Sequence, residues 1–67
     1  MNVSSGEINL LKKTIKNLQI EIKKYKKYQE ETTDPGIQNA FHQITTAKID
    51  HLILMKTILN RVSKGEK

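Results

Sequence analysis

Two long stretches of the chain repeat their apolar residues at the spacing of an α-helix. In the first stretch, steps of three and four connect Ile8, Leu11, Ile15, Leu18, Ile22 and Tyr25. This is the heptad pattern of a helix that packs lengthwise against a partner helix, with isoleucine at one core position and mainly leucine at the other. The pattern predicts a helix over about residues 5–31.

The second stretch is the most apolar part of the chain, and its apolar face contains two polar residues. Steps of four and three connect Ile37, Phe41, Ile44, Lys48, His51, Met55, Ile58 and Val62, which predicts a helix over about residues 35–62. The face is widened by Ala40, Ala47 and Leu54 on one side and by Leu52 and Leu59 on the other. This arc spans roughly 160° at about 100° per residue, and Ile49 and Ile53 lie outside it. Because one helix cannot cover so broad a face, a second helical surface is implied.

Residues that begin and end helices mark the boundaries of the two stretches. Ser4 followed by Glu7 is a capping box, which favours a helix start at residue 5. Asp34 is a good N-cap, and Pro35 suits the first turn of the next helix. The turn at residues 32–34 is short enough to force the helices to run antiparallel. Residues 63–67 are expected to form a polar tail.

The predicted fold is therefore an all-α antiparallel helical hairpin in one domain, residues 1–67. The broad face of the second helix leads us to expect that two hairpins form a homodimeric four-helix bundle with coiled-coil-like packing. The residues expected in its core or interface are Ile15, Leu18, Ile22, Tyr25, Phe41, Ile44, Leu52, Met55 and Leu59.

Length and composition exclude several ways of stabilising a small fold. A chain of 67 residues buries a modest core, and it has no cysteine for a disulfide or a thiolate zinc site. No apolar run reaches the length of a membrane span, and the first residues lack the hydrophobic core of a signal peptide. These features favour a soluble cytoplasmic protein without a membrane partner.

The net charge of +5 comes mainly from lysines on the polar side of the first helix. This basic face consists of Lys12, Lys13, Lys16, Lys23, Lys24 and Lys27. A solvated helix surface explains such a face. The alternative is an electrostatic surface for nucleic acid, anionic lipid or an acidic protein, and Ile20 among the lysines is not needed on a purely solvated face.

Lys48 and His51 stand three residues apart within the apolar face. The register of an antiparallel hairpin places Glu21 near the level of Lys48, so the two side chains are expected to meet. One interpretation is a buried polar group formed by Glu21, Lys48 and His51 that fixes register and partner choice. The other is a charged inner site for acid–base chemistry, an anion or a metal.

The chain contains no motif for catalysis or for binding a cofactor. Neither a nucleophile elbow, a phosphate-binding loop nor a dinucleotide fingerprint is present. His42 and His51 do not share a helix face, and no thiolate is available to complete a zinc site. We therefore expect no enzyme activity, no cofactor and no bound metal.

Residues 21–59 resemble the helix–turn–helix half of ferritin-like and rubrerythrin-like proteins. The resemblance lies in Glu21, the Asp34-Pro35 turn, Phe41, and the run Lys48-Ile49-Asp50-His51. It implies a four-helix architecture in which a glutamate of the first helix and a Glu-x-x-His motif of the second hold two metal ions. Lys48 stands where the family has a ligating glutamate, and an ammonium there disfavours metal.

The leading functional prediction is a non-enzymatic assembly or regulatory module that acts through protein–protein contacts, with itself or with another protein. A binder of nucleic acid or of an acidic protein, which uses the basic face, is the first alternative. A degenerate ferritin-like metal-binding protein is the second.

Overall fold

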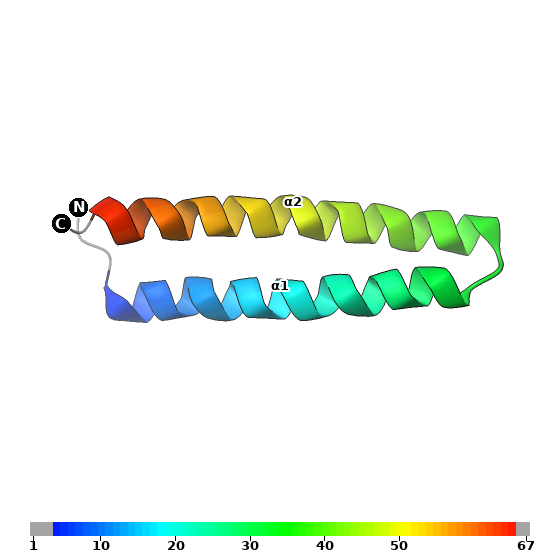
Figure 1. Ribbon diagram of the computed structural model, residues 1–67, viewed down its shortest axis with the longest axis horizontal. Coiled ribbons are helices and arrows are strands. Elements are labelled where there is room, and N and C mark those ends of the chain that lie inside the picture. Colours follow the sequence, from blue (N-terminus) through cyan, green and yellow to red (C-terminus); the bar gives the residue numbers. More distant parts are fainter. Residues whose placement is uncertain (1–3, 66–67) are drawn as a thin grey trace.

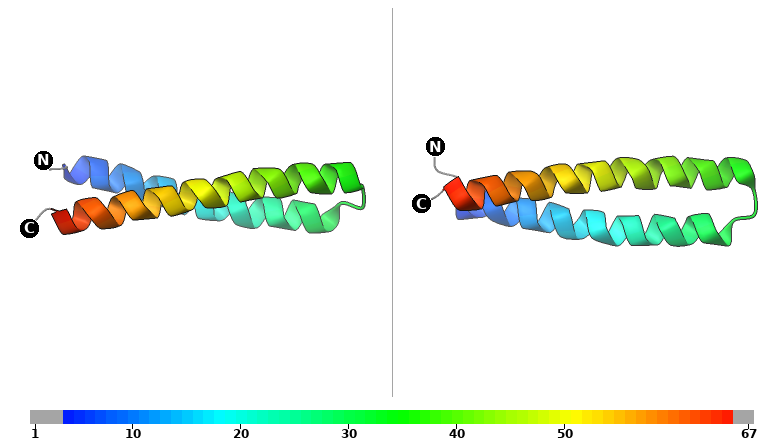
Figure 2. Two further views of the ribbon diagram at one scale, coloured as in Figure 1. Left: turned by 90° about the horizontal axis from the view of Figure 1, so that it is seen from above. Right: turned by 45° about the horizontal axis from the view of Figure 1, so that its top comes forward.

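The computed structural model describes residues 4–65, which form two helices lying side by side (Figure 1). Helix α1 spans Ser5–Glu31 and helix α2 spans Pro35–Gly65. The two helices run antiparallel, so α1 begins at the same end of the molecule at which α2 finishes. They cross at a shallow angle when the molecule is turned (Figure 2). The predicted all-α helical hairpin is confirmed.

The capping residues recognised in the sequence start both helices. The Glu7 amide donates to Ser4 Oγ over 3.1 Å, and the Ser4 hydroxyl lies 3.3 Å from Glu7 Oε1. At the second start, Asp34 Oδ1 accepts the Ile37 amide over 3.0 Å. Each side-chain oxygen satisfies an amide that has no partner within the first turn of its helix.

The turn between the helices is held by hydrogen bonds that Thr32 makes on both sides of it. Helix α1 ends as the Thr32 amide donates to the Tyr28 carbonyl over 3.2 Å. The Gln38 side-chain amide donates to the Thr32 carbonyl over 2.7 Å, which ties the first turn of α2 to the end of α1. This short, bonded turn holds the helices antiparallel.

Helix α2 is longer than the sequence pattern indicates. It continues through Ser63 and Lys64 to Gly65, whereas we expected a polar tail to begin at residue 63. A basic residue in the last turn, Lys64, favours this extension because it complements the partial negative charge of a helix C-terminus. Residues 66–67 of the expected tail lie outside the described residues.

The contact between the helices is one heptad seam from each of them. On α1 it follows the predicted residues, with Ile15 and Leu18 buried and Ile22 and Tyr25 half-buried. On α2 the seam consists of Gln38, Phe41, Thr45, Lys48, Leu52, Met55, Leu59 and Val62, all buried or half-buried. The steps of three and four along both lists are those of coiled-coil packing.

The face that α2 turns toward α1 differs from the predicted face by about 50°, one position of the heptad. Thr45 and Leu52 lie in the seam, whereas Ile44 and His51 are exposed. Ile44 is 40% exposed and therefore does not belong to the core of the single hairpin. A role for Ile44 in an interface with another chain stays a prediction.

The hairpin is elongated and has a thin core. Its dimensions are 51 × 14 × 11 Å, and its radius of gyration is 15.3 Å. A compact domain of this length has a radius of gyration of about 11 Å. Among the described residues, the buried apolar side chains are Ile15 and Leu18. Two helices alone therefore enclose little apolar volume.

Candidate functional site

Lys48 is the charged residue of the seam, and it contacts Glu21 as the register predicts. Its Nζ donates to Glu21 Oε1 over 3.4 Å. The Lys48 side chain is 24% exposed and that of Glu21 is 39% exposed. Because both groups retain contact with water, the pair stabilises the hairpin only modestly.

An aromatic cluster lies next to this ion pair, toward the turn. The rings of Tyr25 and Phe41 stack with centroids 6.0 Å apart, and Tyr28 lies 5.6 Å from Phe41. The Lys48 ammonium lies 5.7 Å from the centroid of the Tyr25 ring, within cation–π range. Lys48 therefore finds both a carboxylate and an aromatic face within the seam, which compensates for its partial removal from water.

Within the single hairpin His51 does not join Glu21 and Lys48, which form a partly exposed pair. The side chain of His51 is exposed on the flank of α2. The reason is geometric: the step of four from Lys48 to Leu52 stays in the seam, and the step of three to His51 leaves it. Any role of His51 in partner choice requires a second molecule.

Side chains that could bind a metal stay apart in the part of the chain that the structure describes. Between residues 4 and 65, no three side chains of the types His, Cys, Asp and Glu gather closely enough to hold an ion. Glu21, the family-like candidate ligand, instead accepts a hydrogen bond from Lys48. The positive charge next to Glu21 is therefore the ammonium group of Lys48.

Thr45 is a buried polar residue that the sequence pattern did not reveal. It is 4% exposed, and its hydroxyl oxygen has no hydrogen-bond partner among the described residues. The spacing from Phe41 to Thr45 and from Thr45 to Lys48 already follows the seam. The position was missed because a pattern of apolar residues does not include threonine. A buried hydroxyl without a partner lowers the stability of the fold.

A second heptad seam runs along α2 and is not covered by α1. Steps of three and four connect Ile37, Ala40, Ile44, Ala47, His51, Leu54 and Ile58, all exposed except the half-buried Ile58. The opposite flank of α2 carries a mixed set, namely His42, Thr46, Ile49, Ile53, Lys56 and Asn60. The broad apolar arc seen in the sequence therefore consists of two adjacent seams, of which the hairpin uses one.

Two apolar side chains of α1 lie on the same flank as the second seam. Leu10 is 64% exposed and Tyr28 is 42% exposed. We call the large exposed apolar residues of this side the apolar flank, which consists of Leu10, Tyr28, Ile37, Ile44 and Leu54.

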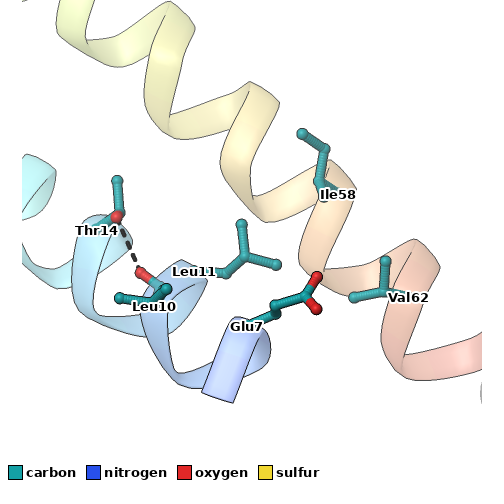
Figure 3. Close-up of a pocket in the computed structure, with 6 residues that line it drawn as sticks. All are labelled: Glu7, Leu10, Leu11, Thr14, Ile58 and Val62. Carbon is teal, nitrogen blue, oxygen red and sulfur yellow. Dashed lines mark hydrogen bonds between the residues drawn. The ribbon is translucent and has the colours of Figure 1, made fainter. Parts of the chain in front are cut away.

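A shallow pocket marks one end of this flank (Figure 3). Its walls come from both helices and consist of Glu7, Leu10, Leu11, Thr14, Ile58 and Val62. The close-up shows Ile58 and Val62 on one side and Leu10 and Leu11 on the other. The lining is mainly aliphatic, so the pocket suits an apolar side chain of another molecule.

The basic face of α1 points to solvent. All six of its lysines are exposed, and Ile20 between them is 56% exposed. Lys24 also lies near an aromatic ring, with its Nζ 5.2 Å from the centroid of Tyr25. The face is therefore available to an anionic partner.

Comparison of the chain with family models, with functionally described proteins and with solved structures found no match. The resemblance to ferritin-like proteins stays a prediction. Within residues 4–65, neither helix has a segment that combines the length and the apolar character needed to cross a membrane.

Proposed function

We propose that this chain is a non-enzymatic assembly module that acts by packing its exposed helical surface against another protein, in the first instance a second copy of itself. The observation that carries the proposal is the uncovered second seam of α2, which has the heptad spacing of the seam that α1 covers. A sustained heptad pattern is a feature of helices that pack against another helix.

The exposed area of the hairpin supports the same proposal. The chain exposes 5268 Å², and a compact monomer of its 7.7 kDa mass exposes about 4,300 Å². The surplus of roughly 1,000 Å² is comparable to the ~800 Å² that each partner contributes to an interface of standard size. Association with one further hairpin removes a surplus of this size.

Light scattering and sedimentation at micromolar concentration test the proposal directly. We expect a mass of two chains, with helicity that falls on dilution because dimerisation stabilises each hairpin. A well-folded hairpin that remains monomeric throughout the micromolar range would refute self-assembly.

A second candidate function is the binding of a polyanion by the basic face, and the exposure of Ile20 among the lysines is the observation that favours it. Its test replaces Lys16, Lys23 and Lys27 by Gln, with Lys56, Arg61 and Lys64 on α2 replaced as a charge-matched control. If the basic face binds short nucleic acids, the affinity should fall steeply as the salt concentration rises. The α1 variant should then lose binding, and the α2 control should keep it.

A further inference from the structure

We infer that the apolar flank is the surface on which the second copy docks, about a two-fold axis that crosses the hairpin at the level of Gln19 in α1 and Ile49 in α2. The axis runs across both helices, so the turns of the two hairpins lie at opposite ends of the bundle. Helix α1 then packs on α1 and α2 on α2, both antiparallel. This inference rests on the proposed self-association and assigns its surface and register.

The level of the axis follows from the hairpin itself. The contact between Glu21 and Lys48 fixes which residues of the two helices lie side by side, and it places Gln19 close to the level of Ile49. Both residues also lie near the middle of their helices, Ser5–Glu31 and Pro35–Gly65. An axis at this level lets the two hairpins overlap along their full length.

The self-complementarity of the second seam about this axis is the main argument for a second copy. In an antiparallel pair of heptad seams, residues from the two alternating positions meet in layers. Ile44 meets Leu54 of the second copy, and by symmetry Leu54 meets Ile44. Ile58 meets Ala40, so that a large side chain lies opposite a small one.

The same axis also pairs the two exposed apolar residues of α1. Leu10 and Tyr28 lie at equal distances along α1 on either side of Gln19, so Leu10 of one copy meets Tyr28 of the other. With the axis along the hairpin instead, Ile44 would face Lys24 and Ile37 would face Glu31. The crosswise axis therefore pairs Ile44 with Leu54 and Leu10 with Tyr28, and it places Ile37 next to Arg61. The lengthwise axis covers Leu10 with Ile58 but places both Ile44 and Ile37 against charged residues.

His51 takes the central position of this interface. It lies next to the axis and faces Ala47 of the second copy, where a small side chain leaves room for the imidazole. A single polar residue in the middle of an otherwise apolar seam is a known means of fixing register and partner choice. His51 would have this role between chains, as Lys48 has within the chain.

The area of the flank is sufficient for a stable dimer. The hairpin is 51 Å long and 14 Å wide, so one flank presents about 700 Å², close to the ~800 Å² per partner of a standard interface. The most strongly basic part of α1, which includes Lys13, Lys16, Lys23 and Lys27, stays outside this contact. Association is therefore driven by apolar burial, and like charges meet where this register places Glu7 near Glu31 of the second copy.

Two adjacent residues provide a matched test of the surface. Leu54 and Ile53 are 51% and 58% exposed, and they lie on opposite flanks of α2. We expect Leu54→Glu to raise the dimer dissociation constant at least tenfold, and Ile53→Glu to change it less than about twofold. A dimer that is disrupted by Ile53→Glu and retained by Leu54→Glu would overturn the assigned flank and leave the proposed function intact.

The register is tested by complementation between two weakened variants. Ile44→Glu and Leu54→Lys should each impair dimerisation. A 1:1 mixture of the two variants should instead form a heterodimer. The carboxylate introduced in one copy faces the ammonium introduced in the other, and the remaining contact keeps Ile44 against Leu54. Sedimentation of the mixture should show the dimer restored, and circular dichroism should show its helicity, even where the separate variants unfold.

The control mixture combines Leu10→Glu with Leu54→Lys, which carry the same charges at positions that do not meet. It should stay dissociated. If the Ile44→Glu and Leu54→Lys mixture also stays dissociated while the wild type is a dimer, the crosswise register is wrong. A wild type that is monomeric refutes the proposed self-association itself, so the failures are distinguishable.

Discussion

Replacement of Thr45 by valine should stabilise the protein, although it removes a hydroxyl from the centre of the molecule. Thr45 lies in the seam between α1 and α2 at 4% exposure, and its Oγ1 has no hydrogen-bond partner among the described residues. Valine has nearly the same shape and restricts the same side-chain torsion, so the packing of the seam is preserved. The substitution changes mainly the polarity of one buried group.

The magnitude follows from the burial of that group. A buried polar group without a partner costs about 1–3 kcal/mol, and a buried methyl group contributes up to about 0.8 kcal/mol of its own. Because valine and threonine have similar helix propensities, no opposing backbone term is expected. We therefore expect the free energy of unfolding to rise by about 1–3 kcal/mol, and Tm to rise by at least about 4 °C.

Urea unfolding followed by circular dichroism measures this change, with all variants at one protein concentration because association alters the apparent stability. Thr46→Val is the matched control, since Thr46 is the exposed neighbour of Thr45 and undergoes the same chemical change. It should alter the stability by less than about 0.5 kcal/mol. If Thr45→Val is less stable than the wild type while Thr46→Val is neutral, the Thr45 hydroxyl is bonded in the native state and the reasoning fails.

Three further experiments test the parts of the hairpin separately. Leu18→Ala removes one of the two apolar side chains that are buried among the described residues and should cost about 2–5 kcal/mol in urea unfolding; a loss below about 1 kcal/mol would show that α1 packs through another face. Asp34→Ala removes the cap of α2 and should cost about 0.5–2 kcal/mol, whereas Asp34→Asn, which keeps an accepting oxygen, should cost less. Glu21→Gln and Lys48→Met should together destabilise less than the sum of their separate effects, with a coupling below about 1 kcal/mol for a partly exposed pair; additive effects would show that the 3.4 Å contact contributes no stability.

The limits of the helices were predictable because single residues with strong local effects set them. Ser4 and Asp34 bond the free amides at the two helix starts. Each cap is reinforced by a second local signal, since Glu7 completes the capping box of Ser4 and Pro35 follows Asp34. The end of α2 was not predictable to the same degree. Ser63 and Lys64 are compatible with either a helix or a tail, and the pattern of apolar residues has already stopped at Val62.

The face of α2 that packs on α1 was misplaced because two seams lie side by side on that helix. Periodicity alone averages two adjacent seams into one broad face whose centre falls between them. Ile44 and His51 were therefore assigned to the same face as Phe41 and Met55. The correct seam passes through Thr45, which an apolar pattern overlooks. By contrast, α1 carries one seam, and its face was predicted correctly.

The contact between Glu21 and Lys48 was predictable since it depends on register, and the short turn fixes the register. The outward position of His51 was not predictable, because its side of the helix depends on the choice between the two seams. For the same reason, the sequence alone did not show which apolar residues of α2 pack on α1. It also did not show which of them stay exposed.

The two polar residues of the apolar arc then have distinct functions in the proposed assembly. Lys48 lies in the covered seam, where Glu21 3.4 Å away compensates its charge. His51 lies at the equivalent central position of the uncovered seam, where Ala47 of a second copy would leave space for it. A polar residue at the centre of each seam lowers stability somewhat, but it disfavours displaced registers that would place it against a large aliphatic side chain. Ile15 and Leu18 are the buried apolar side chains among the described residues. In the proposed assembly the second seam would therefore add the apolar burial that a single hairpin lacks, and His51 would set the register of that contact.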